Sequence, residues 1–287
     1  MRMIKTLLDK VGIEINFKKG LNDFEIYNEL YPQDSIANRR FYNICAGGHF
    51  EFGGKFNHPY WTTADVNRPW NKKDRNYDSS KDIAFDAARL EKLPIESNSA
   101  ELVYSKLTVE HITDEACENL FREIYRILKP GGIVRFISPN SDLYYRAFLH
   151  NDYHFYYFRK DHVSLANASI AQLYIDHFAG SVAKHNAREG SRFVSDEELA
   201  QLLKEYPFDK AMDKITALCD PEYHLKNRRS HRNWWNFEKY QRKLGETGFN
   251  NVMQSCPGQS FAPPMRNLNY FDNYFQKIMI FVEAVKG

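Results

Sequence analysis

Cysteine is scarce in this 287-residue sequence, which contains four cysteines and no C-x-x-C pair. Scattered cysteines of this kind fit reduced thiols better than a disulfide framework or a zinc site. No stretch approaches the ~20 consecutive apolar residues that span a bilayer. Residues 1–20 are interrupted by charge and lack the small-residue cleavage site of a signal peptide. We therefore expect a cytoplasmic protein without a membrane span.

The sequence also has no large excess of charge of either sign: its formal net charge is only +2. Such a chain has no strong overall attraction to nucleic acid or to a membrane surface. Hydrophobic residues (43%) and charged residues (26%) occur in the proportions of an ordinary globular protein. The length suits one large α/β domain, or one domain with a sizeable insertion. Only the aromatic content, 15%, is high enough to need an explanation.

Between residues 40 and 140, short apolar runs alternate with turn residues and one clear helix. In that helix, apolar side chains recur along one face from Ile112 to Leu128, with Thr113 as the expected N-cap and a stop signal at 129–132. This alternation predicts a doubly wound α/β fold with a mostly parallel sheet covered on both faces. The expected strands are 41–45, 61–65, 82–86, 101–105 and 133–138.

Four of the expected strands end in residues that suit a ligand site: Gly47 and Gly48, then Asp65, Asp86 and Ser105. The carboxyl ends of parallel strands share one edge of the sheet, where ligands bind. Glycines let a ligand approach the backbone closely. Asp65, which follows Gly47 by 18 residues, can accept hydrogen bonds from both hydroxyls of a ribose, and Asp86 can accept one from an adenine amino group. Each feature alone is also typical of a solvated turn, but their order favours a nucleoside-containing cofactor.

Four stretches resemble the class I S-adenosylmethionine-dependent methyltransferases of the type 11 kind: YNICAGGHF, HPYWTTADV, FDAARLEKLPIESNSAELVYSKLTVEHI and FREIYRILKPGGIVRFISPN. The last two are the most specific, since they join L-P-x-x-x-x-S, E-H-I and R-x-L-K-P-G-G. The resemblance covers residues 40–140 strongly and continues weakly to the final KIMIFVEAVK, which is similar to the last antiparallel strand of the family. It implies a seven-stranded Rossmann-like sheet and S-adenosylmethionine as the cofactor.

The resemblance also implies which positions bind the cofactor. They follow the first four strands in turn: Asn43, Ala46, Gly47 and Gly48, then Asp65 and Val66, then Asp86 and Ala87, then Ser105. The first loop of the family usually reads acid-x-G-x-G-x-G, whereas here Asn43 replaces the acid, Cys45 the first glycine and His49 the third. Asn43 can form hydrogen bonds but lacks a charge for the ammonium group of the cofactor. Asparagine with A-G-G and a downstream H-P-x-W-x-x-x-D is similar to a subgroup associated with surface-polysaccharide biosynthesis.

Two later segments are expected to bind the substrate. Residues 143–162 hold much of the aromatic excess, which suits sugars or other ring-shaped acceptors, or serves to cover the core. Residues 225–240 combine arginines with Trp234 and Trp235, which suits a phosphate-bearing acceptor such as a nucleotide sugar, or RNA. The pattern slightly favours tryptophans that pack inward.

Metal ligation is weighed at one triplet, His150-x-Asp152-x-His154. The spacing resembles that of metal ligands, but such a triplet in a tyrosine-rich loop is more typical of a protein surface. The sequence therefore predicts no metal.

The catalytic step needs a base, because a hydroxyl acceptor must lose its proton as it is methylated. Histidine is favoured because it is mostly neutral near pH 7. We rank His231 first, within the arginine cluster, His162 second, after the aromatic run, and His111 third. Glu110 and His111 together are more typical of a helix start that supports the loop after the fourth strand.

Four regions are expected: an N-terminal cap at 1–39, a cofactor-binding core at 40–140, a substrate-binding extension with late core helices at 141–248, and C-terminal strands at 249–287. The leading hypothesis is an O-methyltransferase of small molecules or glycans. The alternatives are an RNA methyltransferase, against which the low net charge argues, and a non-catalytic interaction protein on the same fold.

Overall fold

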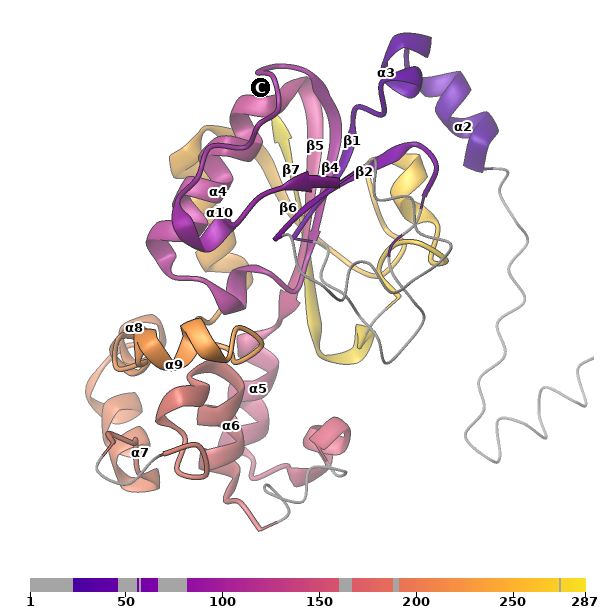
Figure 1. Cartoon of the computed structure of the whole chain (residues 1–287). Coiled ribbons are helices and arrows are strands. Elements are labelled where there is room, and N and C mark those ends of the chain that lie inside the picture. The colour runs from indigo at the N-terminus through magenta and orange to yellow at the C-terminus, as the bar shows by residue number, and fades with distance from the viewer. Residues whose placement is uncertain are drawn as a thin grey trace, which may run out of the picture.

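A computed structural model describes residues 23–45, 56, 58–66, 82–159, 167–187, 191–273 and 275–287, and its central element is a seven-stranded sheet (Figure 1). The strand order is β3-β2-β1-β4-β5-β7-β6, in which β1 to β5 pair in parallel and β7 is antiparallel to both neighbours. The strands are β1 (Phe41–Ile44), β2 (Trp61–Asp65), β3 (Asp82–Ala84), β4 (Ala100–Lys106), β5 (Leu128–Pro139), β6 (Phe249–Ser255) and β7 (Met279–Lys286).

This topology confirms the predicted doubly wound fold, including its last antiparallel strand. The five expected parallel strands are present, although β3 ends two residues earlier than expected, at Ala84. Strand order reverses between β1 and β4, which are neighbours in the sheet. In doubly wound sheets, ligands bind outside the carboxyl ends of the strands at such a reversal.

Helices α4 (Asp114–Ile127) and α10 (Phe237–Thr247) cover one face of the sheet, where their apolar side chains share a core with β4, β5 and β7. The predicted N-cap is confirmed, because the Thr113 hydroxyl accepts a hydrogen bond from the Ala116 amide at 3.2 Å. The helix ends at Ile127, and Gly131 adopts a left-handed φ of 77° early in β5, between Leu128 and Ile133, where the register with β4 shifts. Lys-Pro-Gly-Gly thus ends this helix as predicted, because proline cannot continue a helix and glycine tolerates this φ.

The other face is covered by α2 (Asp23–Leu30), α3 (Gln33–Ala37) and the segment between β6 and β7, which includes the short helices η8 (Pro263–Arg266) and η9 (Gln276–Ile278). Arg135 of β5 is fully buried here and forms ion pairs with Asp272 at 2.7 Å and Glu283 at 3.1 Å. Its guanidinium also donates to the carbonyl oxygens of Cys256 and Gln259. One buried cation therefore anchors the β6–β7 segment to the sheet.

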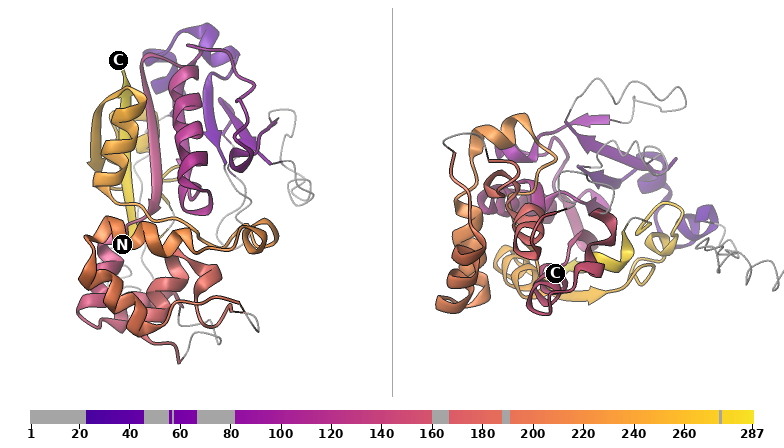
Figure 2. Two further views of the ribbon diagram at one scale, coloured as in Figure 1. Left: turned by 90° about the vertical axis from the view of Figure 1, so that its left-hand side faces the viewer. Right: turned by 90° about the horizontal axis from the view of Figure 1, so that it is seen from below.

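A helical extension lies beyond the carboxyl ends of the parallel strands (Figures 1 and 2). It begins at α5 (Ser141–Leu149), directly after β5, and continues through α6 (Ile170–Phe178), α7 (Asp196–Glu205), α8 (Phe208–Ala217) and α9 (Pro221–Lys226). Short helices η5 (Tyr153–Arg159) and η7 (Gly180–Val182) join these elements. The extension thus covers the edge at which the expected ligand residues end.

Some aromatic side chains of the extension are buried in the core and others are exposed. Tyr144 and Tyr156 are buried in the core, whereas Tyr153 and Tyr157 are more than 40% exposed. Tyr144 stacks on His177 of α6 with ring centroids 4.0 Å apart.

Among the described residues, no helix is long and apolar enough to cross a membrane.

Candidate functional site

The carboxyl ends of β1 and β2 lie around Cys45. The Cys45 amide donates to the Ala64 carbonyl at 2.7 Å, and Cys45 itself has a left-handed φ of 57°. Residues other than glycine rarely adopt this conformation, which gives a physical reason for glycine at this position in the family. Burial raises the pKa of the Cys45 thiol, and the nearby carboxylates of Asp65 and Asp86 raise it further. The thiol is therefore close enough to feel the charges of both acids that the sequence assigns to the cofactor.

Asn43 precedes this point on β1 and is only 3% exposed. Its Oδ1 atom has no hydrogen-bond partner among the described residues. A buried carbonyl oxygen in this state is costly unless a donor from elsewhere reaches it. Asn43 is thus available to a donor group such as an ammonium.

Asp65 ends β2, and its Oδ1 atom accepts a hydrogen bond from the Val66 amide at 2.7 Å. This bond fixes the carboxylate at the edge of the sheet, at the position where a ribose diol is expected. Asp65 and Val66 are both partly exposed, which a ligand contact requires.

Asp86 caps the short helix η3 (Ala87–Arg89) by accepting a hydrogen bond from the Ala88 amide at 3.2 Å. Its other carboxylate oxygen accepts a hydrogen bond from Arg228 at 2.7 Å. Arg228 follows α9, so this ion pair joins the extension to the end of β3. Ala87 itself is 3% exposed. The sequence did not predict a partner for Asp86 from the extension.

The end of β4 holds one hydroxyl and one amine. Ser105 is 1% exposed, and its hydroxyl donates to Oγ1 of Thr108 at 3.1 Å, which ties the loop after β4 to the strand. Lys106 donates to Oδ1 of Asn273 at 3.5 Å. Burial lowers the pKa of Lys106 to about 8, against a smaller opposing effect of Asp272.

Three of the predicted cofactor residues, Ala46, Gly47 and Gly48, lie outside the described residues, as do His49 and the second-ranked base His162. The roles assigned to these residues stay predictions.

A second group of side chains, here called the Glu–His–His cluster, consists of Glu110, His111 and His231. One ligand-type atom from each residue lies within 4.8 Å of the others, and the two imidazole rings are 4.6 Å apart between centroids. Glu110 and His111 belong to η4 (Val109–His111), after β4, whereas His231 lies between α9 and α10. The first- and third-ranked predicted bases therefore lie together, at the junction of the sheet edge and the extension.

Glu110 is the buried member of this cluster, with 1% of its surface exposed. Neither of its carboxylate oxygens has a hydrogen-bond partner among the described residues. Burial raises its pKa to about 8. Its backbone carbonyl accepts hydrogen bonds from the amides of Arg232 at 2.8 Å and Asn233 at 3.1 Å. The main chain of Glu110 thus supports the loop, as the sequence suggested. These backbone contacts do not involve the carboxylate of its side chain.

The two imidazoles are oriented by backbone carbonyls. Nδ1 of His231 donates to the carbonyl of His177, and Nδ1 of His111 lies 3.4 Å from the carbonyl of Ser230. A carbonyl oxygen can only accept, so Nδ1 carries the hydrogen in each hydrogen bond, and in the neutral imidazole the lone pair is then on Nε2. Both rings therefore have a defined tautomer.

A polar network holds this junction together from the side of α10. The Asn233 amide donates to the Asp114 carboxylate at 2.9 Å and to the Ile112 carbonyl at 3.0 Å. Lys239 is buried and donates to both Asn233 and Asp114. Trp234 and Trp235 are each 1% exposed. The tryptophans pack inward, as the sequence slightly favoured, and cannot serve as exposed stacking surfaces for RNA bases.

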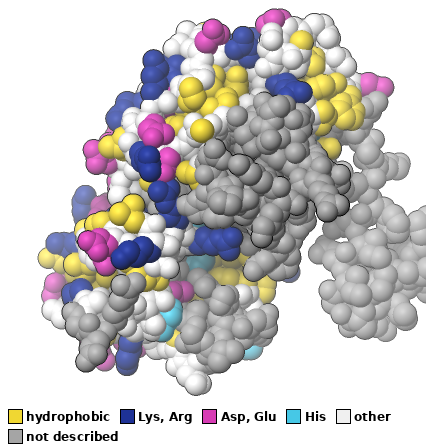
Figure 3. Space-filling model, in the orientation of Figure 1, with side chains coloured by type: hydrophobic (Ala, Val, Ile, Leu, Met, Phe, Trp, Pro, Cys, Tyr) yellow, Lys and Arg dark blue, Asp and Glu magenta, His cyan; other side chains and the backbone are white. Residues whose placement is uncertain are grey.

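Basic side chains gather along the boundary between the sheet and the extension on the face shown in Figure 3. His150 and Asp152, which follow α5, and His154, in η5, are by contrast exposed. Glu110 and Arg228 are the residues whose placement sequence reasoning missed. Their partners are 121 and 142 positions away along the chain, at His231 and Asp86, and no local pattern signals such a contact.

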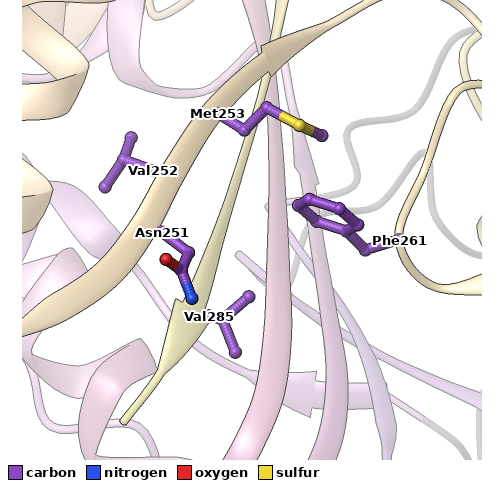
Figure 4. A pocket seen from close by; sticks show the side chains of 5 residues that line it. All are labelled: Asn251, Val252, Met253, Phe261 and Val285. Carbon is purple, nitrogen blue, oxygen red and sulfur yellow. The ribbon is translucent and has the colours of Figure 1, made fainter.

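A pocket of about 500 Å³ lies elsewhere, against the edge strand β6 (Figure 4). It is lined by Asn251, Val252, Met253, Phe261 and Val285. Strands β5 and β7 separate β6 from β4 in the sheet. This pocket is therefore not part of the carboxyl-edge site, and no titratable side chain lines it.

Residues 59–136 match the sequence family described as a methyltransferase domain. This region is the domain of an S-adenosylmethionine-dependent methyltransferase. The match runs from just before β2 into β5, so it includes both strand-end acids and η4. The enzyme takes S-adenosylmethionine as its cofactor. No curated protein matches this sequence.

Several solved structures are similar in fold at low sequence identity. An S-adenosylmethionine-dependent methyltransferase from Mesorhizobium loti is 14% identical, with 93% of this chain and 99% of that chain covered and a TM-score of 0.41. A methyltransferase complex with the Trm112 activator of Haloferax volcanii gives 11% identity, 92% coverage of both chains and a TM-score of 0.39. Human N-acetylserotonin methyltransferase with bound SAM gives 12% identity, 88% and 51% coverage and a TM-score of 0.38.

Proposed function

We propose that this methyltransferase transfers the methyl group to a hydroxyl of a small molecule or sugar, as in the cytoplasmic synthesis of surface polysaccharides or related compounds. The observation that carries this proposal is the Glu–His–His cluster, which lies next to the end of β4 where the extension covers the sheet edge. A hydroxyl is a poor nucleophile, and a positioned group that takes its proton contributes ~10²–10⁴-fold.

The residues of the sheet edge fit the cofactor. The buried Oδ1 of Asn43 has no donor among the described residues, which suits the ammonium of the methionyl part. The oriented carboxylate of Asp65 suits the ribose diol, and Asp86 with Ala87 suits the adenine. Bound there, S-adenosylmethionine supplies the methyl group on a sulfonium leaving group.

The acceptor side is formed by the cluster and its surroundings. His231 is the first candidate to take the hydroxyl proton and His111 the second, because both rings are held by backbone carbonyls in a defined tautomer. Arg228, Arg229 and Arg232 come from the same segment as His231 and would favour an acceptor that bears a phosphate.

The test has two stages that use the full chain. Isothermal titration with S-adenosylmethionine comes first, and no heat at millimolar ligand would refute the proposal in favour of a non-catalytic role. Labelled methyl transfer to a panel of nucleotide sugars, simple glycosides, phenols and RNA comes second. Transfer to a sugar or phenol hydroxyl is expected, whereas transfer to RNA alone would favour the alternative.

His231→Ala should reduce turnover at least tenfold and leave the affinity for S-adenosylmethionine intact. His154→Ala, at an exposed histidine outside the cluster, is the matched control. An equal loss of cofactor binding in His231→Ala would mark the residue as structural.

A further inference from the structure

Each side chain of the Glu–His–His cluster is a common metal ligand, and the set of two imidazoles and one carboxylate is one that zinc and related transition metals use in open, reactive sites. We propose that this cluster binds one divalent transition-metal ion, of the zinc type, between η4 and the segment 228–233. Only the catalytic consequence rests on the proposed function. The binding itself follows from the three side chains.

The carboxyl of Glu110 is the first observation that points to an ion. A carboxyl buried to 99% without a hydrogen bond to either oxygen from the described residues is costly to the fold. Within the part of the chain that the structure describes, its recorded ion-pair partner is an imidazole, with Nε2 of His111 4.0 Å from Oε1. A divalent ion would give the carboxylate the positive partner that its burial requires.

The carbonyl contacts of the two histidines are the second observation. Metal-bound histidines almost always donate their other ring N–H to a carbonyl or carboxylate, which fixes the ring and its tautomer. His231 does so to His177 and His111 does so, more loosely, to Ser230. Both rings therefore carry on Nε2 the lone pair that a metal would take.

The spacing of the cluster suits an ion after a small contraction. Ligand atoms on a tetrahedral zinc ion with bonds of about 2.0–2.1 Å lie roughly 3.3 Å apart. One nitrogen of each imidazole and one carboxylate oxygen lie within 4.8 Å of one another, so a contraction of roughly 1.5 Å, with some rotation of the rings, would bring the three side chains onto one ion. Three protein ligands leave a coordination position, which would take the acceptor oxygen in the proposed reaction. With the lone pair of His231 on the ion, the ion would replace His231 as the activating group: it would lower the pKa of the hydroxyl, whose proton would pass to water.

The sequence predicted no metal because the only metal-like spacing in it is that of His150, Asp152 and His154, which are close together along the chain. Two members of the cluster are also adjacent, but the third comes from the segment after α9. Only the fold brings the three residues together.

The proposal is tested with tag-free full-length protein that has been treated with a chelator and dialysed. Equilibrium dialysis against Zn²⁺ should give one bound ion per chain, and Co²⁺ should give the visible absorption bands of a low-coordinate nitrogen and oxygen site. Mg²⁺, which prefers an all-oxygen octahedral shell, is the negative probe. Glu110→Gln keeps the shape of the side chain and should weaken Zn²⁺ binding at least tenfold, as should His231→Ala.

The control variant His154→Ala should bind zinc like the wild type, and circular dichroism checks that each variant is folded. No stoichiometric zinc binding, or equal binding in Glu110→Gln, His231→Ala and the wild type, would overturn the proposal. If Glu110→Gln fails to fold, a zinc-dependent rise in the melting temperature of the wild type that His231→Ala lacks still decides the question. Because these measurements need neither cofactor nor acceptor, their failure leaves the proposed methyl transfer standing, and a failure of methyl transfer leaves zinc binding standing.

Discussion

The guanidinium of Arg228 lies 2.7 Å from the Asp86 carboxylate, across the boundary between the extension and the end of β3. The side chains are 30% and 14% exposed, so solvent screens the pair in part. Asp86 is also the residue assigned to the adenine amino group. The arginine and the cofactor would therefore compete for one carboxylate.

Arg228→Ala should raise the affinity for S-adenosylmethionine by up to about fivefold, because a partly exposed ion pair contributes up to ~1 kcal/mol. In the wild type, affinity should increase with salt as the pair is screened, and this dependence should shrink in the variant. Titration calorimetry at two ionic strengths measures both effects, with exposed Arg229→Ala as the control. Weaker binding in Arg228→Ala would instead show that the arginine holds Asp86 in its productive orientation.

Asp65→Asn should weaken cofactor binding by roughly 10- to 100-fold, because hydrogen bonds to a charged group contribute ~1.5–3 kcal/mol. Asparagine can still accept the Val66 hydrogen bond, so the melting temperature should change little. Calorimetric titration and thermal unfolding give the two values, and exposed Asp152→Asn controls for loss of charge. Normal affinity in Asp65→Asn would rule out the ribose contact.

Cys45→Gly should tighten cofactor binding. Glycine adopts the observed φ of 57° without strain and removes the thiol near Asp65 and Asp86. The relief of ~1–2 kcal/mol of strain is partly offset by the greater freedom of glycine in the unfolded chain, so stability should stay within about 1 kcal/mol. Cys45→Ala separates the causes, since it removes the sulfur but keeps the strained Cβ. Weaker binding in both variants would show that the thiol contacts the cofactor favourably.

Lys106→Met tests the lowered pKa at the end of β4. The folded-state pKa of about 8 lies below the ordinary 10.5, so the folded state binds fewer protons between these values and the contribution of Lys106 to stability rises with pH there. The stability of the variant relative to the wild type should therefore fall by roughly 2–3 kcal/mol between pH 7 and pH 10. Urea unfolding at both pH values gives this difference, and Lys204→Met, at an exposed lysine, is the matched control. A pH-independent difference would place Lys106 in solvent.

Arg135→Met should lower the free energy of unfolding by about 3–5 kcal/mol, because it leaves two carboxylates, Asp272 and Glu283, buried without their cation. Arg242→Met removes an exposed helical pair with Glu246 and should cost no more than about 0.5 kcal/mol. Denaturant unfolding of both variants tests the contrast. Equal small losses would mean that the β6–β7 segment carries little of the stability.

The five parallel strands were predictable from the sequence because they are short, local apolar runs that can be recognised within about ten residues. The seven-stranded sheet and its last antiparallel strand followed from the family resemblance. The assignment of Asp65 and Asp86 to the cofactor, which stays a prediction, rests on the same local pattern as the parallel strands. The left-handed φ of Cys45 could not be predicted, because glycine is the residue that normally indicates this conformation and cysteine does not. The Glu–His–His cluster and the Arg228–Asp86 pair depend on how the extension folds back over the sheet edge, which periodicity does not encode.

The segment 228–233 contacts both halves of the site. Arg228 binds Asp86 on the cofactor side, His231 is held by the His177 carbonyl, and the amides of Arg232 and Asn233 bind the carbonyl of Glu110. A cofactor that displaces Arg228 must therefore disturb the same short stretch of backbone that positions the acceptor side. Cofactor and acceptor binding would then be thermodynamically linked, so that each ligand changes the affinity for the other by the same factor.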